Sequence, residues 1–248
     1  MANSMKTMDA THYLLQVGID RSKVPSFNEY PYCLPVCRNM TTIDLHPSVT
    51  FLVGENGAGK STLLEAIAIA SGFNAEGGSR NFGFSTRASH SCLHDVLTIR
   101  RGLKRPQDGF FLRAESFYNV ATEIDNLGVT GYYGNRSLHD QSHGESFMAL
   151  VMERFRGNGI YLLDEPEAAL SPTRQLALIS RIHQLVQANS QFIIATHSPI
   201  LMAYPNATIY SLASDSISKV EYTDTEHYSV TRQFLNNHES MLAELLKE

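Results

Sequence analysis

The sequence contains few cysteines. Cys33, Cys37 and Cys92 are too few, and odd in number, for the disulfide framework of a small secreted protein. The stretch YCLPVC has no second cysteine pair to complete a zinc site, so free thiols are expected. The start of the chain also lacks the charged and then apolar pattern of a signal peptide. We therefore expect a cytoplasmic protein.

Long apolar runs and an excess of positive charge are absent as well. The most apolar segments, residues 51–53 and 192–201, are far shorter than the roughly 20 residues that span a bilayer. Twenty basic against 25 acidic residues give a net charge of −5, which excludes a global field that recruits nucleic acid. Such binding would have to be local. The candidate is IRRGLKRP, residues 99–106, which has no interleaved aromatic side chains for base stacking.

The strongest chemical signal lies in VTFLVGENGAGKSTLLEAIAIA, residues 49–70. The segment begins as a β-rich apolar run, breaks at glycines and continues as a helix. Its loop satisfies G-x-x-x-x-G-K-[ST], whose glycines let backbone N–H groups turn toward phosphate oxygens. We expect Lys60 to reach the β- and γ-phosphates and Ser61 to bind Mg²⁺. The residues predicted to bind ATP here are Gly54, Glu55, Asn56, Gly57, Ala58, Gly59, Lys60, Ser61 and Thr62.

Two later segments predict buried strands that end in polar side chains. GIYLLDEPEAALSP, residues 159–172, has a purely apolar run before Asp164 and Glu165. Ligands of parallel sheets bind at the carboxyl ends of strands, so Asp164 should hold Mg²⁺ and Glu165 should polarise the water that attacks the γ-phosphate. QFIIATHSPIL, residues 191–201, repeats the pattern. It makes His197 a second candidate catalytic residue, in contact with the γ-phosphate.

The stretch QSHGESFMAL crowds Ser142, His143, Glu145 and Ser146 around one glycine. A hydrolytic triad needs a serine, a histidine and an acid from different parts of the chain, because side chains this close in sequence rarely point at one another. The crowding therefore supports a triad poorly. The alternative is a set of groups that hold a ligand at the start of a helix.

Four stretches, in this order, resemble the motifs of a known superfamily. GENGAGKST, SHGES, YLLDEPEAALS and IIATHSP look like the Walker A, signature, Walker B with D-loop and His-switch motifs of the ABC-type ATPases. Within that superfamily the chain looks most like the soluble ATPases related to the heads of chromosome-maintenance and double-strand-break-repair proteins. The resemblance covers roughly residues 49–201. It implies an α/β P-loop NTPase fold with an ABC-ATPase-like nucleotide-binding domain.

The resemblance also implies how the motifs cooperate. Members of the family form a head-to-head dimer that encloses two ATP molecules, each between the P-loop of one subunit and the signature of the other. By this resemblance Ser142, Gly144 and Glu145 bind ATP in trans, at a helix N-terminus that points to the γ-phosphate. His143 and Glu145 depart from the residues that many members carry at these places. The expected cofactors are ATP and Mg²⁺.

Two assignments depend on weaker signals. Transporter-like members carry a glutamine that touches Mg²⁺ after a strand between the P-loop and the signature. Here GFFLRAESFYN supplies the strand and Glu115 follows it, so Glu115 is a candidate metal ligand, whereas Gln107 precedes the strand. Arg113 could pair with phosphate or with Glu115. For the aromatic side chain that stacks on adenine, Tyr30 and Tyr32 both stay open.

The sequence predicts one ABC-type ATPase domain over residues 1–248, with a helical lobe inserted at about 83–145. No heptads occur between the P-loop and the signature, so neither a coiled-coil arm nor a zinc hook is expected there. Two β-like runs, 208–212 and 217–222, precede a closing helical segment.

The leading functional hypothesis is an ATPase whose hydrolysis cycle opens and closes a homodimer, with an unidentified protein partner performing the work. One alternative is the ATP-binding subunit of a membrane transporter, which the missing glutamine disfavours. Another is a nucleic-acid-processing or defence-system ATPase, which only the short basic stretch supports.

Overall fold

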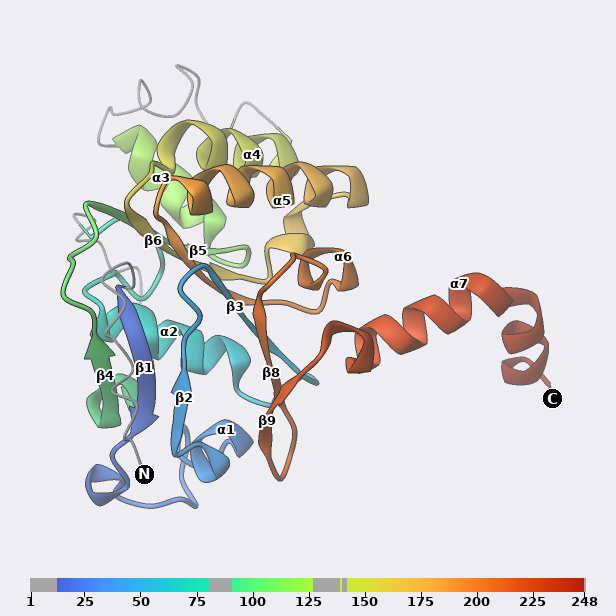
Figure 1. Cartoon of the computed structure of the whole chain (residues 1–248), viewed down its shortest axis with the longest axis horizontal. Coiled ribbons are helices and arrows are strands. Elements are labelled where there is room, and N and C mark those ends of the chain that lie inside the picture. Colours follow the sequence, from blue (N-terminus) through green and yellow to red (C-terminus); the bar gives the residue numbers. More distant parts are fainter. Residues whose placement is uncertain (1–12, 81–90, 127–138, 140–141, 248) are drawn as a thin grey trace, which may run out of the picture.

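A six-stranded sheet forms the centre of the computed structural model, which describes residues 13–80, 91–126, 139 and 142–247 (Figure 1). Five of its strands run parallel, and the last one, at an edge, runs antiparallel to its neighbour. The strand order is β5 (Asp108–Arg113), β6 (Gly159–Asp164), β7 (Gln191–Ala195), β3 (Val49–Val53), β8 (Thr208–Leu212) and β9 (Ile217–Val220).

A smaller antiparallel sheet lies beside the main one. Its strands, in spatial order, are β2 (Thr42–Asp44), β1 (Leu14–Ile19) and β4 (Leu97–Arg101). Helix α2 (Lys60–Ala70) contacts both sheets and lies between them (Figure 1). The short elements around this layer are η1 (Arg21–Lys23), α1 (Pro35–Asn39) and η2 (Cys92–Val96).

The opposite face of the main sheet is covered by helices. These are α3 (Phe117–Asn126), α4 (His143–Arg154) and α5 (Pro172–Gln187), which lie together above the sheet in Figure 1. The remaining elements are η5 (Pro166–Ala169), α6 (Pro199–Met202), η6 (Tyr222–Asp224) and α7 (Glu226–Leu245).

The central strands are apolar on both faces because both faces are covered. In β7, Phe192 and Ile194 belong to the core under α3, α4 and α5, whereas Ile193 and Ala195 belong to the core around α2. Successive side chains of a strand point to opposite faces, so a continuous apolar run is needed to fill two cores. This explains why β3, β6 and β7 have no exposed residue.

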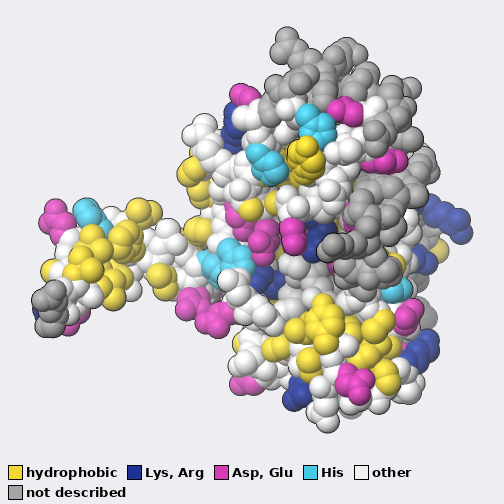
Figure 2. Space-filling view, turned by 180° about the vertical axis from the view of Figure 1, so that it is seen from behind, with side chains coloured by type: hydrophobic (Ala, Val, Ile, Leu, Met, Phe, Trp, Pro, Cys, Tyr) yellow, Lys and Arg dark blue, Asp and Glu magenta, His cyan; other side chains and the backbone are white. Residues whose placement is uncertain are grey.

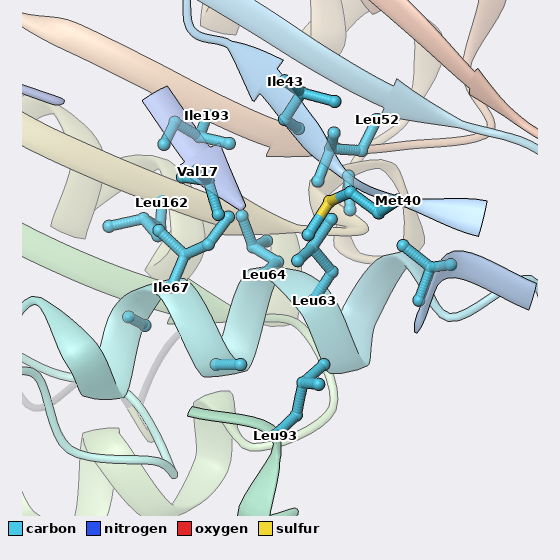
Figure 3. Close-up of a cluster of buried hydrophobic side chains, with 14 of the residues drawn as sticks. Val17, Met40, Ile43, Leu52, Leu63, Leu64, Ile67, Leu93, Leu162 and Ile193 are labelled. Atoms are coloured by element: carbon cyan, nitrogen blue, oxygen red, sulfur yellow. The ribbon is translucent and has the colours of Figure 1, made fainter. Parts of the chain in front are cut away.

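Helix α2 is buried on most of its surface for the same reason. Leu63, Leu64 and Ile67 point from it into the cluster of Figure 3, where Leu162 comes from β6 and Val17 from the smaller sheet. A helix between two sheets needs apolar side chains on more than one side, and α2 satisfies this with a run that is nearly free of charge. The core therefore fixes the helix that follows the P-loop.

The predicted strands agree well with the observed ones. The runs 49–53, 191–195 and 208–212 are strands with these bounds, and the predicted run 217–222 gives a shorter strand, β9. The predicted helical lobe at about 83–145 needs a correction, since its described part includes β4 and β5. Those two strands belong to the sheets, and the α-helices in the described part of this range are α3 and the start of α4. The single-domain assignment stays a prediction.

Helix α7 differs from all the others in its surroundings. None of its 20 residues, all of them described, is buried. Figure 1 shows it leaving the body of the molecule as an arm. Neither α7 nor any other helix in the described residues combines the length and the apolar character that crossing a bilayer requires. Its backbone departs from helical angles at Asn237, where the arm bends.

Candidate functional site

The carboxyl ends of β3, β6 and β7 meet at one edge of the sheet, because these strands are parallel. Asp164, at the end of β6, lies opposite Ala195 of β7, which in turn lies opposite Leu52 of β3. The P-loop follows β3, Glu165 follows β6 and the segment with His197 follows β7. The topology therefore brings three of the predicted motifs to the same place.

The P-loop is closed around the side chain of Lys60. The Lys60 ammonium is almost fully buried and donates hydrogen bonds of 2.9 Å to the carbonyl oxygens of Gly54 and Glu55. Burial lowers the pKa of Lys60, and the nearby carboxylates of Glu165 and Asp164 oppose this shift. The loop thus presents one desolvated cation at the start of α2, which suits a phosphate group.

Gly59, the N-cap of α2, shows why the loop needs glycine. Its φ of +95° lies in the left-handed region, and a Cβ here would lie 2.5 Å from Cγ1 of Val36. The Val36 amide also donates to the carbonyl of Ala58. Segment 34–39 is therefore packed directly against the P-loop, and only a residue without a side chain fits between them.

Asp164 is the buried carboxylate of the site. It is 5% exposed, and its Oδ2 lies 3.4 Å from Nε of Arg113. Burial raises the pKa of Asp164 to about 6, against the opposing effects of Arg113 and the Ser61 hydroxyl. Its Oδ1 is buried and has no hydrogen-bond partner among the described residues. A free carboxylate oxygen beside a serine hydroxyl is what a Mg²⁺ site that is completed by phosphate needs.

Arg113, at the end of β5, connects several carboxylates. Its guanidinium lies 2.8 Å from Oε2 of Glu65 on α2 and 3.4 Å from Oε2 of Glu115, in addition to Asp164. Of the two pairings that the sequence left open for Arg113, the structure contains the one with Glu115. The Glu115 side chain is 86% exposed, and the guanidinium of Arg113 lies next to the carboxylates of Glu115 and Asp164. No group of three acidic, histidine or cysteine side chains in the described residues could hold a metal.

Glu165 and His197 form the next pair along the edge. Glu165 has a φ of +48°, which is uncommon for a residue with a side chain, and its amide donates to the carbonyl of Ala195. Its Oε1 lies 3.8 Å from Nε2 of His197. The left-handed turn therefore directs the carboxylate toward the imidazole. Burial lowers the pKa of His197, which keeps the ring neutral near pH 7.

Glu167 holds the His197 segment in place. Its Oε1 accepts from the backbone N–H of His197 at 2.6 Å, and its Oε2 accepts from the Thr196 hydroxyl at 2.8 Å. Burial raises the pKa of Glu167, and these hydrogen bonds oppose the shift. Sequence reasoning did not single out Glu167. The sequence shows that Glu167 lies two residues after Glu165, but it does not show that Glu167 contacts His197, 30 residues later in the chain.

His227, the second residue of α7, was missed as well. Its Nε2 lies 3.0 Å from Nδ1 of His197. With Glu226, Val230 and Thr231 it lines one wall of a cavity of about 810 Å³. Figure 2 shows histidine and acidic side chains together where α7 joins the body. The surrounding stretch DTEHYSV, residues 224–230, carries no motif that points to the site, and His227 lies 30 residues after His197 in the chain.

Two cavities flank the P-loop. The opposite wall of the larger one, facing α7, comes from the residues Glu55, Asn56, Glu165, Glu167 and His197. A second cavity of about 400 Å³ lies between P-loop residues 54–58, Pro35 and residues 211–214. Among the described residues that line these cavities, none comes from the start of α4. The described start of the predicted signature helix therefore takes no part in either cavity beside the P-loop.

The predicted signature residues form a helix start. Ser142 is the N-cap of α4, and both its backbone N–H and its hydroxyl donate to Oε2 of Glu145. Oε1 of Glu145 lies 3.3 Å from Nη2 of Arg174. Gly144 packs so closely that a Cβ would lie 2.7 Å from the carbonyl of Ala169 in η5. Among the described residues, no histidine side chain is hydrogen-bonded to the side chain of Ser142 or Glu145.

The two tyrosines that the sequence left open for adenine stacking differ in exposure. Tyr32 is buried, and its hydroxyl lies 3.2 Å from Sγ of Cys92. Tyr30 is 65% exposed. Gln107 lies at the amino end of β5 next to Asn158, the end of the strand opposite to Asp164. Tyr30 is thus the one of the pair that is free to stack on a base, and Gln107 lies away from the site.

Comparisons with known proteins agree with this geometry. Residues 27–127 match a family model described as an AAA domain, and residues 143–202 match one described as an AAA ATPase domain. STR2, an ABC transporter G family member of Medicago truncatula, is 28% identical over 171 residues, which are 61% of this chain and 24% of that protein. The nucleoside import ATP-binding protein NupA of Lactococcus lactis is 25% identical over 167 residues, 59% of this chain and 32% of that one.

The matched curated relatives are much longer than the matched region, since it spans about a quarter to a third of their length. A solved structure, cbiO1 from Clostridium perfringens, part of an ABC transporter complex, covers 94% of this chain and 99% of its own, with a TM-score of 0.50 and 16% identity. That likeness concerns the fold. The two family models, the parallel sheet and the P-loop support an ATP-binding ATPase of the AAA or ABC type with a P-loop NTPase fold.

Proposed function

We propose that two copies of this chain enclose ATP between them, hydrolyse it, and use the change in the dimer to act on a protein partner. The observation that carries this proposal is the convergence of Lys60, Asp164, Glu165 and His197 at one edge of the sheet. ATP adds contacts across such a dimer that ADP and phosphate do not. Hydrolysis then shifts the dimer equilibrium by the difference in binding free energy.

Each side chain of the edge has a chemical task in this proposal. Lys60 neutralises the β- and γ-phosphates, and Ser61 and the free Oδ1 of Asp164 hold Mg²⁺. When bound, Mg²⁺ neutralises charge on the phosphates. Glu165 accepts a proton from the attacking water, and His197 donates a hydrogen bond to a γ-phosphate oxygen. Glu115 fits a metal role less well, because its carboxylate is exposed and paired with Arg113.

The signature residues act on the nucleotide of the partner copy in this proposal. Ser142 and Glu145 are exposed, at a helix start that lines neither cavity beside the P-loop of the same chain. The backbone N–H groups of a helix N-terminus suit phosphate oxygens, and Gly144 lets this helix start pack against Ala169 and Arg174. A second copy that faces the P-loop would bring these N–H groups to the γ-phosphate and complete the site.

Mixing two inactive variants tests the shared site. Ser142→Arg removes the signature but keeps the P-loop, and Lys60→Ala does the reverse. A mixed dimer then has one intact site, so the mixture should recover part of the ATPase activity that neither variant has alone. The control is Ser142→Arg mixed with itself under the same conditions. Mixed dimers that are proven by cross-linking and that recover no activity would contradict sharing.

The transporter alternative is favoured by the similarity to NupA and STR2. In that case the dimer would form on membrane-spanning subunits. The absence of a glutamine at the place of Glu115 weighs against it. Fractionation of cells that produce the tagged chain decides between the two. Recovery of the chain with membranes, in a complex with membrane proteins that resists high salt, would favour the transporter subunit.

A further inference from the structure

The ring of His227 contacts His197 at Nδ1, whereas Glu165 lies near Nε2 of the same ring. The Nε2 atom of His227 lies 3.0 Å from Nδ1 of His197, and the ring centroids are 5.1 Å apart. His227 belongs to α7, whose connection to the ATPase motifs the sequence did not reveal. The contact joins the base of the arm to a catalytic candidate.

The base of α7 is fixed although the rest of the helix is exposed. Thr225 is the buried N-cap, and its hydroxyl oxygen accepts from the backbone N–H of Tyr228 and donates to the carbonyl of Tyr222 at 2.7 Å. The Tyr222 hydroxyl donates to the carbonyl of Pro199, two residues after His197. These bonds hold the first turn of α7, and with it His227, against the segment that carries His197.

The surroundings of His197 decide which of its ring nitrogens carries the proton. Its Nε2 has no hydrogen-bond partner among the described residues and lies 3.8 Å from the carboxylate of Glu165. A lone pair on Nε2 would face that negative charge, whereas an N–H there is attracted to it. A neutral ring with its proton on Nε2 has an acceptor at Nδ1. In the part of the chain that the structure describes, the atom within reach of Nδ1 is Nε2 of His227, so His227 must be the donor.

We propose that His227 is a positioning residue that donates its Nε2–H to Nδ1 of His197 and so keeps the His197 proton on Nε2. This inference rests on the proposed function of His197, whose Nε2–H would then point to the γ-phosphate. An orienting group behind a catalytic histidine fixes both its tautomer and its ring plane. Burial lowers the pKa of both rings. Lys60 adds to the lowering at both, and His197 adds to it at His227, whereas Glu165 at His197 and Glu226 and Glu167 at His227 oppose it.

Side-chain ¹⁵N NMR of the full chain without nucleotide tests the tautomer directly. The His197 signals are identified by their loss in His197→Ala. In the unsubstituted chain we expect the shifts of a ring protonated on Nε2. His227→Phe fills the same space without a donor and should give a mixture of the two tautomers, whereas His227→Gln keeps a nitrogen donor and should restore the first pattern. A proton on Nδ1, or no change in His227→Phe, would overturn the proposal.

Steady-state kinetics supply the second measurement. His227→Phe should lower kcat by about tenfold or more, the size of effect known for groups that orient metal-bound histidines. The KM for ATP should change by less than about twofold, because the P-loop is intact, and His227→Gln should recover most of the rate. The matched control is His238→Phe, in the exposed outer half of α7.

The comparison with Glu165→Gln separates the two proposals. If Glu165→Gln and His197→Ala lose activity but His227→Phe does not, the role of His227 is wrong and the proposed function stands. If neither Glu165→Gln nor His197→Ala loses activity, the proposed function of the edge residues is wrong, whatever the activity of His227→Phe.

Discussion

The carboxyl edge of the sheet and the α7 arm show two opposite ways to place side chains. At the edge, Asp164 and Glu167 are buried or hydrogen-bonded through contacts with Arg113 and His197, which lie far away in the sequence. The arm has no buried residue and exposes Leu235 and Leu245 by about 70%. The edge depends on the topology of the whole sheet. The arm depends on its cap and on local helical bonds, and only its base takes part in the site.

The largest expected effect is on catalysis at the edge. Glu165→Gln keeps the shape of the side chain but removes the base, so kcat should fall by about 10²- to 10⁴-fold while ATP still binds. Single-turnover hydrolysis and equilibrium ATP binding measure the two quantities. Glu115→Gln is the matched control and should change kcat by only a few-fold. A comparable loss in Glu115→Gln would restore it as a metal ligand.

A large effect is also expected on nucleotide affinity. Lys60→Ala removes the buried cation of the P-loop, and a lost hydrogen bond to a charged group costs about 1.5–3 kcal/mol, so ATP affinity should fall by about tenfold to 100-fold or more. Titration calorimetry measures it, with the exposed Lys219→Ala as control. An unchanged affinity would count against the P-loop assignment.

The two regions should also differ in their effect on folding. Phe192→Ala removes a fully buried ring from the core under α5 and should lower the free energy of unfolding by about 3–5 kcal/mol. Leu235→Ala, on the arm, should change it by about 0.5 kcal/mol or less. Urea unfolding measures both. A cost of several kcal/mol for Leu235→Ala would show that the arm is packed against something in solution.

The last prediction concerns the effect of pH on stability. Burial raises the pKa of Asp164 from 3.8 to about 6, so the folded chain binds this proton more tightly than the unfolded chain does. Its contribution to stability is therefore complete below pH 3.8 and is lost as the pH rises through 6. The Asp164→Asn variant has no carboxyl group at this position, so it does not lose this contribution as the pH rises. Its stability relative to the unsubstituted chain should rise between pH 4.5 and 7.5, in urea unfolding without nucleotide or Mg²⁺. A constant difference would mean that Asp164 titrates normally.

Much of the fold could be predicted because local patterns report burial directly. The apolar runs at 49–53 and 191–195 are strands with the predicted ends, since a strand that fills two cores cannot carry polar side chains. The P-loop pattern likewise fixes its own conformation, because its glycines and lysine act within a few residues. The extent of the helical lobe was predicted less well, since β4 and β5 pair with strands far away in the sequence.

The sequence by itself determined the class of the protein, its phosphate-binding loop and the acidic and histidine residues at its strand ends. Only the tertiary structure decided that Glu167 holds His197, that Arg113 lies beside Asp164 and that His227 returns to the site from the base of the arm. The physical reason is distance along the chain. Local propensities and motifs encode interactions over a few residues, whereas these contacts exist only after the sheet has brought its strand ends together.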